Sequence, residues 1–121
     1  MRAIAWMEAH QSDVQYISYW TITEFSAAMS AKLRNKEVSA NRRADALARF
    51  GAMTAKVFTV LPVATAQFHA AAQFADNHEL VIRSGDALHL AICAEYQTTL
   101  CTMDRRLAVA GPALGIMTQL V

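Results

Sequence analysis

The sequence has few cysteines, prolines and glycines and no long hydrophobic run. Its 121 residues include two cysteines, two prolines and four glycines. Cys93 and Cys101 form no C-x-x-C pair, so a thiol redox motif is excluded and we expect reduced, buried thiols. No apolar stretch is long enough to span a bilayer, and the opening MRAIAWMEAH lacks the apolar region and cleavage site of a secretory signal. These absences favour a cytoplasmic protein outside the membrane.

A strong overall charge is also absent. The net charge is +1 at pH 7, with 55% hydrophobic and 17% charged residues, which indicates a globular protein. The length suits a single domain over residues 1–121. Basic residues are nevertheless concentrated in the segment 32–49, which contains six basic and two acidic residues. Such a segment is usually a solvated helix pair; alternatively, Lys32, Arg34, Arg42 and Arg43 are candidates for contacts with the phosphates of an RNA.

Several ligand-binding motifs are missing. Neither G-x-G-x-x-G nor G-x-x-x-x-G-K-[ST] occurs, so the nucleotide-binding forms of an α/β fold have no support. His89 and Cys93 lie four residues apart and could share a helical face with a zinc ion, but two ligands alone favour core packing. The aromatic residues are more typical of a core or an interface than of a base-stacking platform.

Hydrophobic periodicity predicts strands that alternate with helices. The predicted helices cover residues 2–10, 21–34, 39–54, 65–77, 86–96 and 104–109. The predicted strands cover residues 14–20, 57–63, 98–103 and 115–120. This order predicts an α/β fold with a mostly parallel sheet flanked by helices, in which sites lie at the carboxyl ends of the strands.

Three of the ten acidic residues are predicted near helix starts: Glu24, Asp86 and Asp104. Each position also has a purely structural explanation. Glu24 would close a capping box with Thr21, Asp104 would cap the helix that follows it, and Asp86 would stabilise the helix dipole.

Taken together, the three acids favour a shared site. Three helix starts of one α/β domain are expected to converge on the same edge of the sheet. Carboxylates that lie close together need a cation, and an all-oxygen site suits Mg²⁺ or Mn²⁺. Such a site would support metal-assisted attack of water on a phosphodiester.

The segments that carry these acids resemble a known family. YISYWTITEFSAAM, RSGDALHLAICA and LCTMDRRLA are similar, in order and spacing, to the second, third and fourth acidic motifs of PIN domains of the VapC toxin type. The resemblance implies a three-layer PIN-like fold in which Glu24, Asp86 and Asp104 bind Mg²⁺ or Mn²⁺ and Thr102 supports Asp104.

The resemblance also implies an activity and partners. It indicates a cytoplasmic, metal-dependent endoribonuclease toxin of a type II toxin–antitoxin system, dimeric and inhibited by a VapB-like antitoxin. An antitoxin helix could lie along Met29 and Leu33.

One feature departs from the family pattern. PIN domains begin with a strand that ends in an Asp followed by a small hydroxyl residue, and no such segment precedes Trp6. We therefore expect the first, central strand and the first acidic motif to be missing, which leaves an N-terminally truncated domain. The alternative function is a catalytically impaired PIN remnant that only binds an antitoxin or dimerises.

Overall fold

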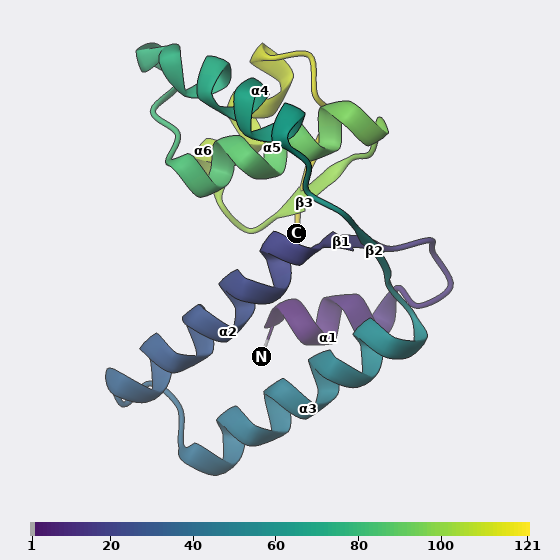
Figure 1. The fold of residues 1–121 in the computed structure, drawn as a ribbon. Coiled ribbons are helices and arrows are strands. Elements are labelled where there is room, and N and C mark those ends of the chain that lie inside the picture. The colour runs from purple at the N-terminus through teal and green to yellow at the C-terminus, as the bar shows by residue number, and fades with distance from the viewer. Residues whose placement is uncertain (1) are drawn as a thin grey trace. The chain divides into compact units, whose positions relative to one another are not determined.

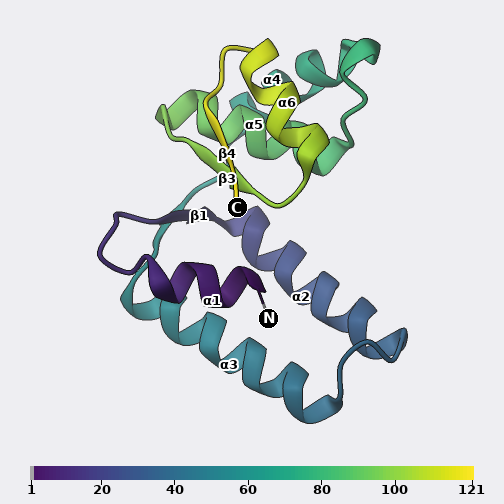
Figure 2. The same ribbon diagram turned by 180° about the vertical axis from the view of Figure 1, so that it is seen from behind.

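The computed structural model describes residues 2–121, which form two compact units divided between Pro62 and Val63 (Figures 1 and 2). The first unit contains α1 (Arg2–Ala9), β1 (Tyr16–Ser18), α2 (Tyr19–Arg34), α3 (Ala40–Lys56) and β2 (Thr59–Leu61). The second contains α4 (Thr65–Asp76), the 3₁₀ helix η1 (His78–Leu80), α5 (Ser84–Tyr96), β3 (Leu100–Thr102), α6 (Arg105–Ala113) and β4 (Thr118–Leu120). Each predicted helix and strand is present with shifted ends. The single-domain organisation stays a prediction.

In the first unit, α1 lies between α2 and α3 (Figures 1 and 2). Ile4 of α1 is fully buried against Met29 of α2 and Ala46 of α3, as expected for the apolar face of a short helix that cannot persist alone. Phe50 stacks on Phe25 with ring centroids 4.1 Å apart. Met29 is only 1% exposed, so its side chain is not accessible to a partner. The prediction that an antitoxin helix lies along Met29 and Leu33 is therefore wrong at Met29.

The second unit is built around α5, which contacts α4 and β3. Leu90 of α5 is fully buried and packs with Leu107 of α6 and with Ile116 before β4. The apolar run after Asp86 is therefore a core helix, as the sequence predicts. No helix within residues 2–121 combines the length and hydrophobicity needed to cross a membrane.

The strands pair in parallel, as predicted, so this is an α/β fold with parallel strands flanked by helices. In residues 2–121 they form two separate two-stranded sheets rather than one: β1 with β2, and β3 with β4. The prediction of a single sheet is therefore corrected for this part of the chain. Each strand has only three residues, and α2 takes up Tyr19 and Trp20 at the end of the first predicted strand.

The start of α2 differs from its prediction. Ser18 is the N-cap: its hydroxyl accepts a hydrogen bond from the Thr21 N–H at 3.3 Å, and its own N–H donates to Thr21 Oγ1 at 3.2 Å. This reciprocal cap starts the helix at Tyr19, although Tyr19 and Trp20 favour a strand. The predicted capping box of Thr21 and Glu24 is wrong, and Glu24 lies in the second helical turn rather than the first.

A glycine in α6 leads to a stability prediction. A Cβ at Gly111 would overlap the methyl group of Thr118, which is held in place because Thr118 Oγ1 donates to Ala108 O at 2.6 Å. We expect Gly111→Ala to lower the free energy of unfolding by about 1–3 kcal/mol through overpacking, less the gain in helix propensity. Urea denaturation measures this change.

The matched control is Gly51→Ala in α3, where an added Cβ meets no atom within 4 Å. This variant should gain roughly 0.5–1 kcal/mol from helix propensity alone. Equal effects of the two substitutions would show that the contact with Thr118 does not restrict position 111.

The two cysteines differ in burial. Both are unpaired, but Cys93 is buried and Cys101 is exposed, so the prediction that both thiols are buried is wrong for Cys101. Burial raises the pKa of the Cys93 thiol above its ordinary value of 9.0, partly offset by a hydrogen bond with Thr98 that lowers it. The neutral thiol is thus favoured in the folded protein.

This difference predicts how stability depends on pH. Above pH 9 the unfolded chain loses the Cys93 proton while the folded chain retains it, so the free energy of unfolding falls as pH rises. Urea midpoints at pH 8, 9 and 10 should decrease more steeply for the natural sequence than for Cys93→Ala. Parallel curves for the two proteins would contradict the prediction.

Candidate functional site

Asp104 sits at the start of α6, two residues after β3. Its Oδ1 accepts hydrogen bonds from the N–H groups of Arg106 at 2.9 Å and Leu107 at 3.3 Å, so Asp104 is the N-cap of this helix. The Asp104 N–H donates to Thr102 Oγ1 at 3.0 Å, which ties the cap to the end of β3. Both cap bonds use Oδ1 and leave Oδ2 as the oxygen that could bind a cation.

Asp86 lies in the first turn of α5, which begins at Ser84, two residues earlier than predicted. Its Oδ2 accepts a long hydrogen bond of 3.4 Å from the Arg83 N–H. The predicted dipole-stabilising position at a helix start is therefore present. Asp86 is partly buried, whereas Asp104 is exposed.

The two helix starts share one pocket. Its volume is about 200 Å³, and it is lined by Val81, Ile82, Arg83, Asp86, Asp104, Arg106 and Leu107. Ligand pockets for whole small molecules usually measure about 300–1,000 Å³, so this pocket suits a smaller group such as an ion with a phosphate. The charged residues in its lining are two aspartates and two arginines.

Glu24 belongs to the first unit, so its convergence with Asp86 and Asp104 stays a prediction. The side chain of Glu24 is partly buried on α2. Among residues 2–121, no three His, Cys, Asp or Glu side chains are grouped so that they could hold a metal ion. The carboxylates that the structure places together are therefore a pair.

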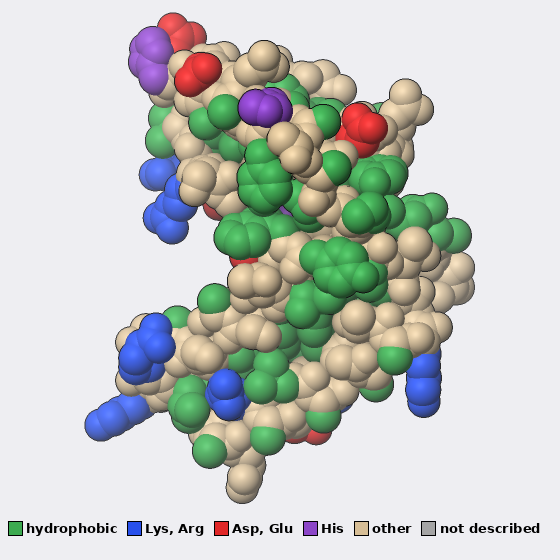
Figure 3. All heavy atoms as spheres, in the orientation of Figure 1, with side chains coloured by type: hydrophobic (Ala, Val, Ile, Leu, Met, Phe, Trp, Pro, Cys, Tyr) green, Lys and Arg blue, Asp and Glu red, His purple; other side chains and the backbone are tan. Residues whose placement is uncertain are grey.

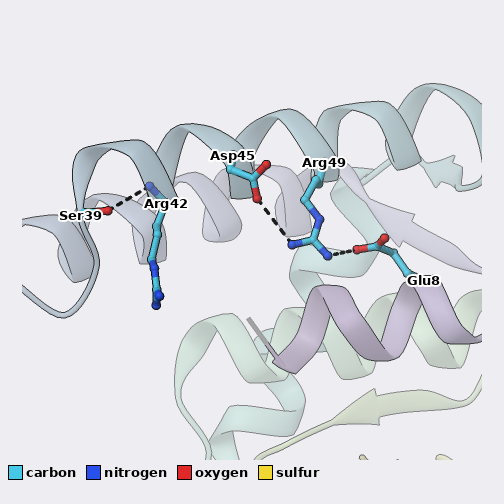
Figure 4. Close-up of polar contacts among 5 residues, drawn as sticks. All are labelled: Glu8, Ser39, Arg42, Asp45 and Arg49. Atoms are coloured by element: carbon cyan, nitrogen blue, oxygen red, sulfur yellow. Dashed lines mark hydrogen bonds and ion pairs between the residues drawn. The ribbon is translucent and has the colours of Figure 1, made fainter.

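The basic segment covers the junction of α2 and α3, where Lys and Arg side chains project from the surface in Figure 3. Some of these cations have polar partners. Lys32 pairs with Glu37 at 3.5 Å, and Arg43 donates to Ser30 Oγ at 3.4 Å. Arg34 and Arg42 are exposed, and Figure 4 shows the Arg42 side chain extended away from α3.

Arg49, in contrast, has a structural role. Figure 4 shows its guanidinium between Glu8 of α1 and Asp45 of α3; it forms an ion pair with each, the one with Asp45 at 3.6 Å. The hydrogen bond to Glu8, more than the charge of either acid, raises the pKa of Arg49 above its ordinary value. Arg49 therefore ties α1 to α3.

Sequence reasoning missed Arg83 and Arg106 as lining residues. The pattern that could have identified them is their spacing: Arg83 precedes Asp86 by three residues, and Arg106 follows Asp104 by two. Each helix start thus contributes one acid and one arginine to the pocket. His89 and Cys93 are not part of a metal-binding group of three within residues 2–121.

Comparisons with known proteins give the family. The family model described as "PIN domain" matches residues 1–111 of the chain. No curated protein and no solved structure matched it in the same comparisons.

Proposed function

Since this chain belongs to the PIN domain family, we propose that it is a divalent-metal-dependent endoribonuclease, with Asp86 and Asp104 as its metal ligands. PIN domains are typically metal-dependent nucleases. The observation that carries the proposal is that these two acids, from two helix starts, line one pocket. Glu24 completes the proposed ligand set from α2, and Thr102 supports Asp104 through the bond to its N–H.

The donor set fits Mg²⁺ or Mn²⁺. Magnesium is usually bound through one or two carboxylates, together with waters and substrate phosphates, and a pair of aspartates offers such oxygens. When bound, the ion would lower the pKa of a water molecule and neutralise charge that develops on the phosphate. The protein fixes one of these carboxylates, because Oδ1 of Asp104 is held by two N–H groups of α6.

The finer proposal is a VapC-like toxin of a type II toxin–antitoxin system. The three motif segments support it by their order and spacing. A VapB-like antitoxin and a homodimer are the proposed partners, and exposed apolar side chains such as Val109 and Met117, which are 74% and 70% exposed, support such contacts. Two unpaired thiols support a reducing, cytoplasmic location.

RNA contacts outside the pocket are proposed for Lys32, Arg34, Arg42 and Arg43. They are cations on one helix pair, and phosphate contacts supply most of the nonspecific affinity for nucleic acids. The exposed Arg34 and Arg42 are the strongest candidates because their neighbours Lys32 and Arg43 already have partners.

The test is cleavage of a mixed RNA pool by the purified chain with Mg²⁺, with Mn²⁺ and with EDTA. Cleavage that needs the metal supports the nuclease. A chain that binds Mn²⁺ and RNA but cleaves nothing would support the alternative, an impaired PIN remnant that acts as a binding module.

A further inference from the structure

Two arginines line the same pocket as the two acids. Arg83 is the N-cap residue of α5, and Arg106 lies in the first turn of α6. Both are exposed, and none of the ion pairs within residues 2–121 involves either of them. Both arginines therefore line the pocket without forming an ion pair with its two aspartates.

We infer that Arg83 and Arg106 bind the RNA phosphate next to Asp86 and Asp104, so that the pocket recognises the phosphodiester backbone rather than the bases. This inference rests on the proposed nuclease function. A guanidinium offers N–H donors in a planar fork that matches two phosphate oxygens. The pocket is also small, about 200 Å³, and its polar lining is charged rather than aromatic.

The charges explain how the two kinds of residue would act together. Two acids and two arginines balance each other while the pocket is empty. A divalent cation on the acids leaves an excess of positive charge, which an RNA phosphate reduces. The cation and the phosphate should therefore strengthen each other's binding, as linkage requires.

The test uses the full chain with Arg83→Ala, Arg106→Ala and Arg106→Lys. The matched control is Arg105→Ala, which removes an exposed arginine of the same helix start that does not line the pocket. Circular dichroism checks that each variant is folded. Binding of a labelled single-stranded RNA is measured by fluorescence anisotropy in Ca²⁺, with a gel to show that the RNA stays intact, and Mn²⁺ binding without RNA is measured by calorimetry.

We expect each alanine variant to raise the RNA Kd about tenfold, as for the loss of a charge-assisted contact. The slope of log K against log salt should fall in magnitude by about 0.7 for each lost phosphate contact. Arg106→Lys should keep part of the affinity because it keeps the charge, and Arg105→Ala should stay close to the natural sequence. Mn²⁺ should bind the alanine variants as tightly or more tightly, since a nearby positive charge is gone.

Three results would overturn the inference. The first is an RNA Kd in both alanine variants that equals that of Arg105→Ala, and the second is no RNA binding by the natural sequence. The third is a loss of Mn²⁺ affinity in parallel with RNA affinity, which would show that the arginines act by positioning the acids. Failure of the proposed nuclease looks different: Asp104→Asn would then keep both Mn²⁺ binding and any cleavage, whatever the arginine variants do.

Discussion

We expect Asp104→Asn to reduce metal-dependent RNA cleavage by about a hundredfold or more, which corresponds to about 2.7 kcal/mol of transition-state stabilisation. The substitution removes a negative charge from the proposed ligand set. It keeps the helix cap, because an Asn side-chain oxygen can accept the bonds that Asp104 Oδ1 receives from Arg106 and Leu107. Cleavage of a labelled RNA in Mn²⁺ measures the loss.

Asp104→Ala is the matched variant because it removes both the charge and the cap. It should lose activity to the same extent and also lose about 1 kcal/mol of stability. Asp104→Asn should unfold within a few tenths of a kcal/mol of the natural sequence. Asp104→Asn with full activity, beside Asp104→Ala with low activity and low stability, would show that Asp104 acts only as a cap.

The sequence predicts the start of α6 correctly because this start depends on neighbouring residues. Asp104 was expected to cap a helix that begins at Arg105, and it does. The predicted start of α2 is wrong because two overlapping cap patterns occur in this segment. Thr21 and Glu24 match a capping-box pattern, but Ser18 and Thr21 make the reciprocal bonds, three residues earlier. A pattern of residue types shows that a cap is possible, whereas the choice between overlapping caps depends on packing.

Strand pairing was predictable only in part. Alternation of strands and helices correctly gave parallel pairing, but the sequence does not say which strands are neighbours. The same holds for the pocket. The predicted positions of Asp86 and Asp104 at helix starts agree with their place in one pocket, whereas Arg83 and Arg106 have only their spacing to these acids as a signal. Lone arginines on a surface have too many possible roles for sequence to select one.

We expect Glu24→Gln to reduce cleavage about a hundredfold as well, if its carboxylate joins those of Asp86 and Asp104 around one ion. The change keeps the size of the side chain and its place in the second turn of α2, so the fold should be retained. Glu95→Gln is the control. It removes an exposed acid of α5 that belongs to no proposed site, and it should leave cleavage unchanged.

The double variant of Glu24→Gln and Asp104→Asn tests whether the two acids serve one ion. Residues that act as a unit are far from additive: once the first substitution has displaced the ion, little activity is left for the second to remove. We therefore expect the double variant to cleave RNA about as fast as the slower single variant, where independent effects would multiply to about ten-thousandfold. Calorimetry should show Mn²⁺ affinity reduced in each single variant. A fully multiplicative loss, or Mn²⁺ affinity unchanged in Glu24→Gln, would place Glu24 outside the metal site and leave Asp86 and Asp104 as its only acids among the three.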